Sequence, residues 1–246
     1  MKTNHFIFKS ETQLGDCLLH AHFMRKVVEN NPNTAFDFYL IDKHWDQVKE
    51  YTEDIPQIKL LTYSNAPKDH LRGWVGQFGI PRLPCALDGL RLAAYQALSE
   101  IKMGIESPFK CVDDLLYDHK SIQTYSTQLK KYDVLLVNSI GFSNQLKAYK
   151  EQDFIDFIKK VKEKHLTIIT TKKIDGVDCT TDINLTVMGI GSLSINCKVI
   201  VGIGTGAMQC CLNVWNKDKR FLYIDNHHYF RQKNIQMIDS INSIIL

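Results

Sequence analysis

Short apolar runs alternate along this chain with longer stretches whose apolar residues recur at helical spacing. Runs rich in β-branched and aromatic residues, bounded by turn-forming residues, are typical of buried strands. They predict strands at residues 6–8, 35–41, 58–61, 132–138, 165–171, 183–186, 198–201 and 220–225. Helical spacing predicts helices at residues 18–28, 45–51, 87–101, 154–161, 208–215 and 235–246, and a short helix that residues 191–194 would cap. Strands that alternate with helices predict the α/β class with parallel sheets.

Two weakly patterned segments interrupt this alternation. Residues 63–84 form a long polar stretch in which cationic and aromatic side chains are interleaved, and residues 104–129 carry little apolar periodicity. Boundaries between domains fall in such stretches. We therefore expect two α/β domains, residues 1–128 and 129–246, with the last helix able to cross back to the first domain.

The composition is that of a globular protein. Of the 246 residues, 44% are hydrophobic and 23% are charged, and the formal net charge is +3. The seven cysteines show no Cys-x-x-Cys spacing, which argues against a disulfide framework or a zinc ribbon and favours a reducing compartment. No apolar run is long enough for a signal peptide or a membrane span. We therefore expect a cytoplasmic protein without a membrane span, and the sequence carries no indication of its oligomeric state.

A glycine-rich segment follows the apolar run that ends at Val201. Gly202, Gly204 and Gly206 lack the Cβ atoms that would hold a ligand away from the backbone, and Thr205 adds a hydroxyl. A strand, a tight turn and a helix that begins at the turn place several N–H groups and the positive helix end at one point. This arrangement predicts an anion site, most simply a phosphate site. The alternative is a glycine-rich turn that binds no ligand.

The same segment fits the loose G-x-G-x-x-G/A pattern of dinucleotide-binding domains. Asp225 lies at a strand end about twenty residues later, where an acid that binds the ribose is expected. This interpretation gives an NAD(P)-binding Rossmann oxidoreductase. In such domains, however, the glycine pattern lies near the start of the domain and several strands follow it. Here only one strand and one helix are expected after the glycine turn. The position of the turn favours a nucleotide held in a cleft between two domains.

Three segments, in order along the chain, carry a resemblance to a known family. Residues 14–25 begin with Leu-Gly-Asp and end with arginine, residues 135–139 are followed by a lysine at position 147, and residues 192–208 contain Ser-Leu and then the Gly/Thr turn. Together they resemble the heptosyltransferase-like glycosyltransferases (the ADP-heptose:lipopolysaccharide heptosyltransferase superfamily). That family has the GT-B fold, so the resemblance implies two Rossmann-like domains with parallel sheets facing a central cleft.

The resemblance also implies an activity and a set of site residues. The activity is transfer of a sugar, such as a hexosyl, pentosyl or heptosyl group, from a nucleotide-sugar donor to an acceptor hydroxyl. Transfer would invert the anomeric carbon and need no obligatory metal or other cofactor. Donor binding would fall to Ser139, Lys147, Gly204, Thr205, Gly206, Ala207 and Met208. N–H groups and a lysine suit this role because the leaving nucleoside diphosphate gains negative charge. Acceptor binding would fall to Gly15, His20, Arg72 and Trp74, and Asp16 would be the general base on the acceptor hydroxyl.

Some of these residues have a plainer interpretation. An aspartate that follows a glycine at a helix start is a common N-cap, so Asp16 could serve the helix alone. Lys147 could be a solvated lysine, with Lys150 near enough to replace it. His20 and His22 lie two positions apart on the expected helix and point to different faces, which argues against a metal pair.

The sequence leaves two questions open: which acceptor the protein uses, and whether it is catalytically active. The acceptor could be a surface glycan or a hydroxylated base in DNA, as in phage-type DNA modification. A DNA acceptor would need a basic rim with stacking aromatics, for which the candidates are Lys68, Arg72, Trp74, Phe78, Arg82 and Arg91. Gly204 stands where the family has Asp, and Gln209 where it has His. These departures raise a further alternative, a degenerate nucleotide-binding protein without catalysis.

Overall fold

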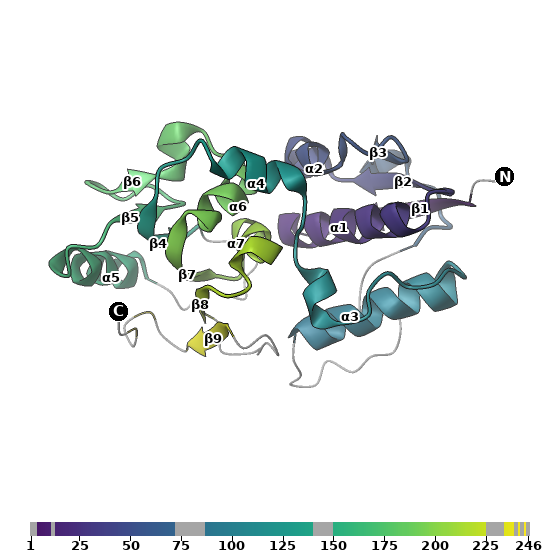
Figure 1. Ribbon diagram of the computed structural model, residues 1–246. Coiled ribbons are helices and arrows are strands. Elements are labelled where there is room, and N and C mark those ends of the chain that lie inside the picture. The colour runs from purple at the N-terminus through teal and green to yellow at the C-terminus, as the bar shows by residue number, and fades with distance from the viewer. Residues whose placement is uncertain are drawn as a thin grey trace. The chain divides into compact units, whose positions relative to one another are not determined.

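The chain forms two α/β units in a computed structural model (Figure 1). The structure describes residues 4–10, 13–71, 87–139, 150–224, 234–238, 241 and 244. The units are Met1–Leu116 and Tyr117–Leu246, and each has its own parallel sheet. Within the described residues, no helix combines the length and the apolar character that crossing a membrane requires.

The first unit is built on a three-stranded parallel sheet. Its strands, in spatial order, are β1 (Asn4–Ser10), β2 (Thr34–Leu40) and β3 (Ile58–Thr62). Its helices are α1 (Leu14–Asn30), α2 (Trp45–Thr52) and α3 (Leu87–Ala97), and a π-helical turn, Leu98–Lys102, continues α3. On the side of β1 away from β2, Leu71 forms a parallel bridge with Phe8. The chain therefore returns across β1 after completing β3.

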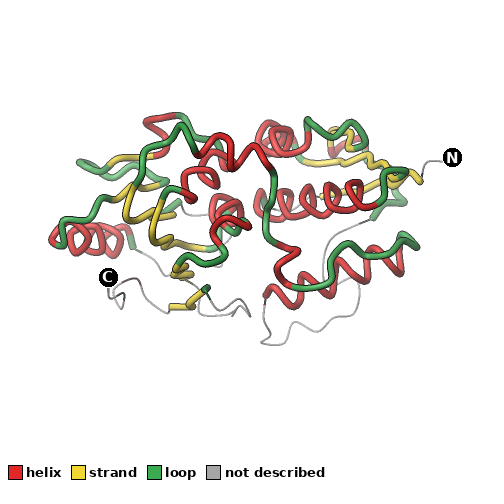
Figure 2. Tube along the Cα trace, viewed as in Figure 1, coloured by secondary structure: helices red, strands yellow, loops and turns green. Residues whose placement is uncertain are grey.

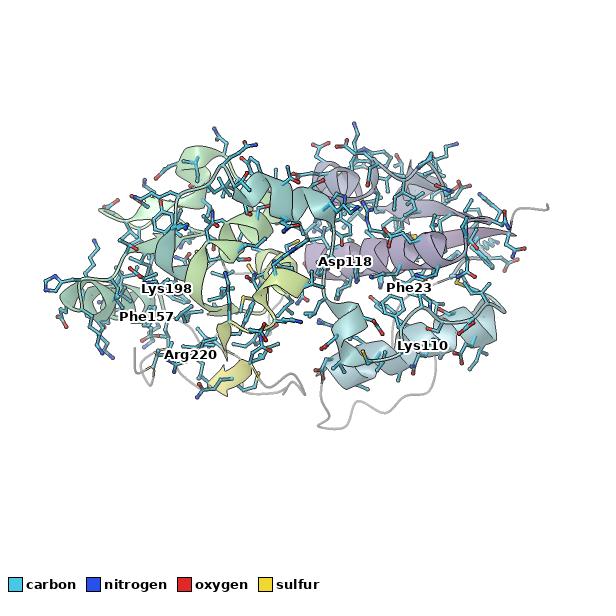
Figure 3. The ribbon with its side chains drawn as sticks, viewed as in Figure 1. Phe23, Lys110, Asp118, Phe157, Lys198 and Arg220 are labelled. Atoms are coloured by element: carbon cyan, nitrogen blue, oxygen red, sulfur yellow. The ribbon has the colours of Figure 1, made fainter. Side chains whose placement is uncertain are left out.

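Helix α1 is buried on almost every side, because it lies between the sheet and α3. Phe23, near its middle, lies with its ring centroid 6.1 Å from that of Phe8 on β1 and 4.9 Å from that of Tyr95 on α3 (Figure 3). It also stacks on Phe109, with 5.7 Å between centroids and 10° between planes. Between Cys17 and Val28, Lys26 alone is not buried, so most of α1 belongs to the core of this unit. This aromatic cluster fixes α1, and with it the place of its first turn.

The second unit carries a six-stranded parallel sheet in the order β6-β5-β4-β7-β8-β9 (Figure 2). The strands are β4 (Tyr132–Val137), β5 (Ile168–Thr170), β6 (Asp178–Cys179), β7 (Cys197–Ile203), β8 (Arg220–Ile224) and β9 (Ile235–Ile238). The helices are α4 (Lys120–Ser126), α5 (Glu151–Glu163), α6 (Val187–Ile195) and α7 (Gly206–Cys211).

The two faces of this sheet are covered by different helices. Side chains alternate between faces along a strand, and one set packs with Phe157 and its neighbours on α5 into a single core (Figure 3). That set includes Val201 on β7 and Leu222 on β8. The other face lies under α6 and α7 (Figure 1). Residues such as Gly202 and Tyr223 therefore face α6 and α7.

The predicted fold class, α/β with two units and parallel sheets, is confirmed. Most predicted strands and helices are present within a few residues of their expected ends. The units divide between Leu116 and Tyr117, whereas the sequence placed the division after residue 128. Helix α4 packs against α6, and the Asn196 side chain donates to the carbonyls of Ser126 at 2.6 Å and Leu129 at 2.8 Å. These contacts assign residues 117–128 to the second unit.

Three local predictions are wrong. The strand expected at residues 183–186 is a 3-10 turn, Thr180–Ile183, that ends at Asn184 in the left-handed conformation. Residues 191–194 lie inside α6 and do not cap it, because Thr186 is its N-cap and accepts from the Gly189 N–H at 3.1 Å. The closing helix expected from residue 235 begins instead as β9, an edge strand parallel to β8.

Candidate functional site

The sheet of the second unit reverses its winding between β4 and β7. From β4 the chain proceeds outward through β5 to β6, then returns to the other side of β4 with β7. In open α/β sheets, ligands bind outside the carboxyl ends of the strands at such a switch point. Ser139 follows β4 closely and Thr205 follows β7 closely. The topology thus brings two of the predicted donor-binding residues to the expected place.

The glycines at this point accommodate protein atoms. A Cβ on Gly202 would lie 2.5 Å from the Cβ and 2.9 Å from the carbonyl oxygen of Val137 on β4. A Cβ on Gly204 would overlap the hydroxyl of Tyr223 and lie 3.0 Å from its Cζ. Neither glycine, nor Gly206, has a positive φ. Gly202 therefore lets β7 approach β4, and Gly204 makes room for Tyr223, where the sequence suggested room for a ligand.

Thr205 is the N-cap residue of α7, yet its hydroxyl does not cap the helix. The Thr205 Oγ1 atom is buried and has no hydrogen-bond partner in the described part of the chain, and the residue is only 9% exposed. The backbone around it is ordered by its own bonds, from the Thr205 N–H to the Ile203 carbonyl at 2.7 Å and from the Gln209 N–H to the Thr205 carbonyl at 3.1 Å. A buried hydroxyl left without a partner costs about 1–3 kcal/mol. A ligand oxygen at this position would remove that cost.

Ser139 is held by a polar latch between the carboxyl ends of β4 and β5. The Asn138 side-chain oxygen accepts from the N–H groups of Thr171 at 3.0 Å and Lys172 at 2.8 Å, and its amide donates to the Lys172 carbonyl at 3.1 Å. The Thr171 hydroxyl oxygen in turn accepts from the N–H groups of Asn138 and Ser139, each at 3.1 Å. The same hydroxyl lies within donating distance of the Ser139 hydroxyl at 3.2 Å and of the Asn138 side-chain oxygen at 3.3 Å. The latch fixes the backbone of Ser139 beside the switch point.

The first unit has a switch point of the same kind, at the carboxyl end of β1. β2 lies on one side of β1 and Leu71 on the other. Asp16 is the third residue of α1, the helix that follows β1, and the N-cap is Gln13. The interpretation of Asp16 as the N-cap is therefore wrong. Among the described residues, the half-buried Asp16 carboxylate makes no hydrogen bond or ion pair.

Gly15 and His20, the predicted acceptor residues on α1, differ in their surroundings. Gly15 lies beside Asp16 in the first turn and is partly exposed. The buried His20 places Nδ1 3.0 Å from the Ser10 hydroxyl, which lies 3.3 Å from Cys17 Sγ. His22 is fully buried, with Nδ1 3.1 Å from the Tyr51 hydroxyl, and its Nε2 donates to the Asp114 carbonyl at 3.2 Å. The two histidines have different partners, as their spacing predicts.

The Tyr95 hydroxyl on α3 lies within electrostatic range of both Asp16 and Arg91. Burial raises the pKa of Tyr95 far above its usual value, the Arg91 guanidinium lowers it, and the Asp16 carboxylate raises it. The Tyr95 hydroxyl therefore stays protonated, and it shares its surroundings with one anion and one cation. The sequence considered Arg91 only as part of a DNA-binding rim.

Several predicted residues lie outside the described residues: Lys147, Arg72, Trp74, Phe78, Arg82 and Asp225. Among the described residues near the switch point, three were not named by the sequence analysis: Asn138, Thr171 and Tyr223. Asn138 and Thr171 each follow an apolar strand directly, and that position was the available signal. Tyr223 gave no signal, because only the register that pairs it with Gly202 brings its ring toward the glycine turn.

The strand order bears on the oxidoreductase alternative. Counted within the unit, β4 to β9 follow the order 3-2-1-4-5-6 of dinucleotide-binding domains. In those domains the glycine fingerprint follows the first strand, which here is β4. The turn at residues 202–206 follows β7, the fourth strand. The glycine pattern therefore lacks the structural context that the NAD(P) interpretation requires.

Comparison with known proteins gives matches in structure alone. No protein-family model matches the chain, and no curated protein matches its sequence. Among solved structures, E. coli heptosyltransferase WaaC with ADP-2-deoxy-2-fluoro heptose matches with a TM-score of 0.62 and 10% identity, over 95% of this chain and 92% of that one. A family 9 glycosyl transferase from Veillonella parvula DSM 2008 matches with 0.57 and 9%, over 97% and 87%.

E. coli ADP-heptose lps heptosyltransferase II matches with a TM-score of 0.53 and 9% identity, over 98% of this chain and 94% of that one. The three proteins share a fold with this chain along nearly their whole length, at identities where side-chain roles do not carry over. The chain therefore has the fold of the heptosyltransferase-like glycosyltransferases, as the three sequence segments predicted.

Proposed function

We propose that this protein is an inverting glycosyltransferase that moves a sugar from a nucleotide-sugar donor to an acceptor hydroxyl. The observation that carries the proposal is the buried Thr205 hydroxyl at the switch point of the second sheet, which has no hydrogen-bond partner among the described residues. Support also comes from a fold shared with heptosyltransferases over almost the whole chain. The proposal needs no obligatory metal and no other cofactor.

In this proposal the second unit binds the donor diphosphate. Its oxygens accept hydrogen bonds from the Thr205 hydroxyl and from the first N–H groups of α7, which belong to Gly206, Ala207 and Met208. Ser139 and Lys147 complete the anion site. When the bond between sugar and diphosphate breaks, charge builds up on the leaving phosphate. Donors already fixed in place stabilise this charge without reorganising, which lowers the barrier to transfer.

Asp16 is the proposed general base. The incoming acceptor hydroxyl attacks the anomeric carbon and loses its proton to the Asp16 carboxylate as the new glycosidic bond forms. A carboxylate without an ion-pair partner retains its lone pairs for this proton. Gly15 and His20, with Arg72 and Trp74, are the proposed acceptor contacts.

We further propose a glycan hydroxyl as the acceptor and the cytoplasm as the place of reaction. One of the similar solved structures is an lps heptosyltransferase, and this likeness favours a glycan over a base in DNA as the acceptor. The DNA alternative predicts affinity for duplex DNA that falls steeply with salt. Titration of duplex DNA at two salt concentrations decides between them, and tight, salt-dependent binding would overturn the glycan assignment.

Two threonines at helix starts provide a matched test of the donor site. Thr205→Val removes the unpartnered hydroxyl and keeps the shape, so we expect unchanged or higher stability and roughly tenfold weaker binding of nucleoside diphosphates. Thr186→Val removes a hydroxyl that does cap α6, so it should cost about 1 kcal/mol of stability and leave that binding unchanged. Calorimetry with ADP, GDP, UDP and CDP, together with chemical denaturation, measures both. Equal nucleotide affinity in wild type and Thr205→Val would contradict the donor site.

A further inference from the structure

Thr171 follows β5 directly and connects that strand to β4 at the carboxyl end of the sheet. The residue is buried, at 7% exposure. Its hydroxyl oxygen accepts hydrogen bonds from the N–H groups of Asn138 and Ser139, each at 3.1 Å. A hydroxyl oxygen has two lone pairs, and both are occupied here. The Thr171 oxygen therefore cannot accept a further hydrogen bond from the Ser139 hydroxyl.

The hydrogen of the Thr171 hydroxyl has two oxygens within reach. They are the Asn138 side-chain oxygen at 3.3 Å and the Ser139 hydroxyl at 3.2 Å. The Asn138 oxygen already accepts from the Lys172 N–H at 2.8 Å and from the Thr171 N–H at 3.0 Å, a donor that it shares with the Leu136 carbonyl. Two donors match the two lone pairs of an amide oxygen. The Ser139 hydroxyl is thus the acceptor that remains for the Thr171 hydrogen.

These bonds determine how the Ser139 hydroxyl can act. Because it accepts from Thr171, its own hydrogen points away from the latch. Within the described residues, the contact with Thr171 is the only hydrogen bond of this hydroxyl. Ser139 is half-buried, and it lies two residues after Val137, which pairs with Gly202 on β7. Thr205, three residues after Gly202, belongs to the same edge of the sheet, so two hydroxyl hydrogens from adjacent strands are available there.

We infer that Thr171 is a positioning residue of the donor site, because it keeps the Ser139 hydroxyl hydrogen available for a diphosphate oxygen of the bound nucleotide. The inference rests on the proposed function, in which Ser139 is part of the anion site, and it adds the residue that sets the direction of the Ser139 bond. Asn138 contributes by accepting two backbone N–H groups, which leaves the Thr171 hydrogen to Ser139. Diphosphate oxygens only accept hydrogen bonds, so they match a serine that is held as a donor.

A double-mutant cycle between Thr171 and Ser139 is the direct test. Ser139→Ala removes a hydrogen bond to a charged group, so the tightest nucleoside diphosphate among ADP, GDP, UDP and CDP should bind on the order of tenfold to a hundredfold more weakly. Thr171→Val keeps the shape and lets the Ser139 hydroxyl rotate. It should weaken binding roughly fivefold to tenfold in wild type and less than twofold in Ser139→Ala. Calorimetry on the four proteins measures these factors. Equal factors in both backgrounds, or no loss in wild type, would overturn the inference.

Stability separates this role from a structural one. Thr171→Val leaves the N–H groups of Asn138 and Ser139 without their acceptor in both backgrounds, so the denaturation midpoint should fall equally with and without the Ser139 hydroxyl. The affinity loss alone should depend on that hydroxyl. Thr171→Ser keeps the bonds and should bind within twofold of wild type, and a loss there would show that the hydroxyl is not what matters. If Thr171→Val does not fold, Thr171→Cys carries the same cycle, because its sulfur remains a weak acceptor.

Thr167, at the amino end of β5, provides a matched control. Its hydroxyl likewise accepts a backbone N–H from β4, that of Asp133 at 3.0 Å, and donates to the Asp133 carboxylate at 2.8 Å. Thr167→Val should leave nucleotide affinity within twofold of wild type. A loss equal to that of Thr171→Val would show that any break between β4 and β5 weakens binding, and the inference would fall.

The same measurements distinguish this inference from the proposed function. If wild type binds none of the four nucleoside diphosphates, the proposed function fails. If wild type binds and Thr205→Val weakens binding, but the effect of Thr171→Val does not depend on Ser139, the donor site stands and only the role of Thr171 fails.

Discussion

The carboxyl ends of the two sheets resemble each other in topology and differ in how their polar groups are satisfied. Each end is a switch point, and each carries a predicted site residue without a hydrogen-bond partner among the described residues. In the first unit this residue is Asp16, whose carboxylate is half-buried and open to water. In the second it is Thr205, whose hydroxyl is buried away from water.

The difference indicates a division of work. A carboxylate in contact with water has its hydrogen bonds supplied by solvent, so Asp16 gains little stability from a ligand and remains available to take a proton. The buried Thr205 hydroxyl has no such supply, and its unmet bond costs about 1–3 kcal/mol until a ligand provides one. We therefore assign binding energy to the second unit and chemistry to the first.

The largest expected effect tests this division directly. Asp16→Asn keeps the shape of the first turn of α1 and removes the base, so kcat should fall on the order of a hundredfold to ten thousandfold. Affinity for nucleoside diphosphates should stay within twofold of wild type, because the proposed donor site belongs to the other unit. Transfer of labelled sugar to a glycan acceptor measures kcat, and calorimetry measures affinity. Unchanged turnover would remove Asp16 from the mechanism.

The sequence indicated the position of both residues better than their surroundings. Asp16 and Thr205 each follow a strand that can be recognised in the sequence from its run of apolar residues. A residue that follows a strand of a parallel sheet lies at the carboxyl end of that sheet. What Gly202 and Gly204 accommodate depends on strands β4 and β8, more than fifteen residues away along the chain. Local pattern therefore suggested ligand space there, and the strand register showed Val137 and Tyr223 in it.

The wrong elements have a related cause. Residues 235–238 have apolar positions whose spacing fits both a helix and a strand. They form a strand because they pair in parallel with β8. The Gly-Ser-Leu-Ser segment at residues 191–194 contains residues common in caps, but Gly191 is needed inside α6 because a Cβ there would lie 2.8 Å from the Cys210 carbonyl oxygen on α7. Packing between distant segments overrode local propensity in both cases.

The next effect in size concerns the packing that brings β4 and β7 together. Gly202→Ala places a methyl group against Val137, including its backbone carbonyl, so the two strands must separate at the switch point. Overpacking of this kind costs about 1–3 kcal/mol, and nucleotide affinity should fall with it. Chemical denaturation measures the cost. A loss of stability with full affinity would show that the donor site tolerates displacement of β7.

Gly189→Ala provides the matched control in α6. The three atoms nearest to its added methyl would be side-chain atoms of Leu185 and Tyr125, at 3.2 to 3.4 Å. Alanine also favours the interior of a helix by about 0.5–1 kcal/mol over glycine. The gain and the tight contact should nearly cancel, so stability and affinity should remain close to those of wild type.

The smallest expected effect lies at the amino end of the second sheet, where charges are paired with one another. The Asp133 carboxylate accepts from Lys198 Nζ at 2.7 Å and from the N–H and hydroxyl of Thr167, each at 2.8 Å (Figure 3). The Lys198 ammonium, with the two Thr167 bonds, lowers the pKa of Asp133 to about 2. A pKa lowered by folding adds stability that is fully present above the unfolded value of about 3.9, and this increment is lost as the pH falls from about 4 through the folded value of about 2.

Asp133→Asn should therefore lower stability by less than about 1 kcal/mol at pH 7, because Lys198 is exposed and solvent screens its charge. The difference between variant and wild type should shrink as the pH falls from 4 to 2, because about half of the Asp133 carboxyls in folded wild type are protonated when the pH equals their pKa of about 2. Denaturation at pH 7, 4 and 2 measures it, and nucleotide affinity at pH 7 should not change. A weakened nucleotide affinity would mean that the amino end of the sheet contributes to binding. The contrast between an amino end whose charges pair with one another and a carboxyl end that is proposed to bind a ligand would then no longer hold.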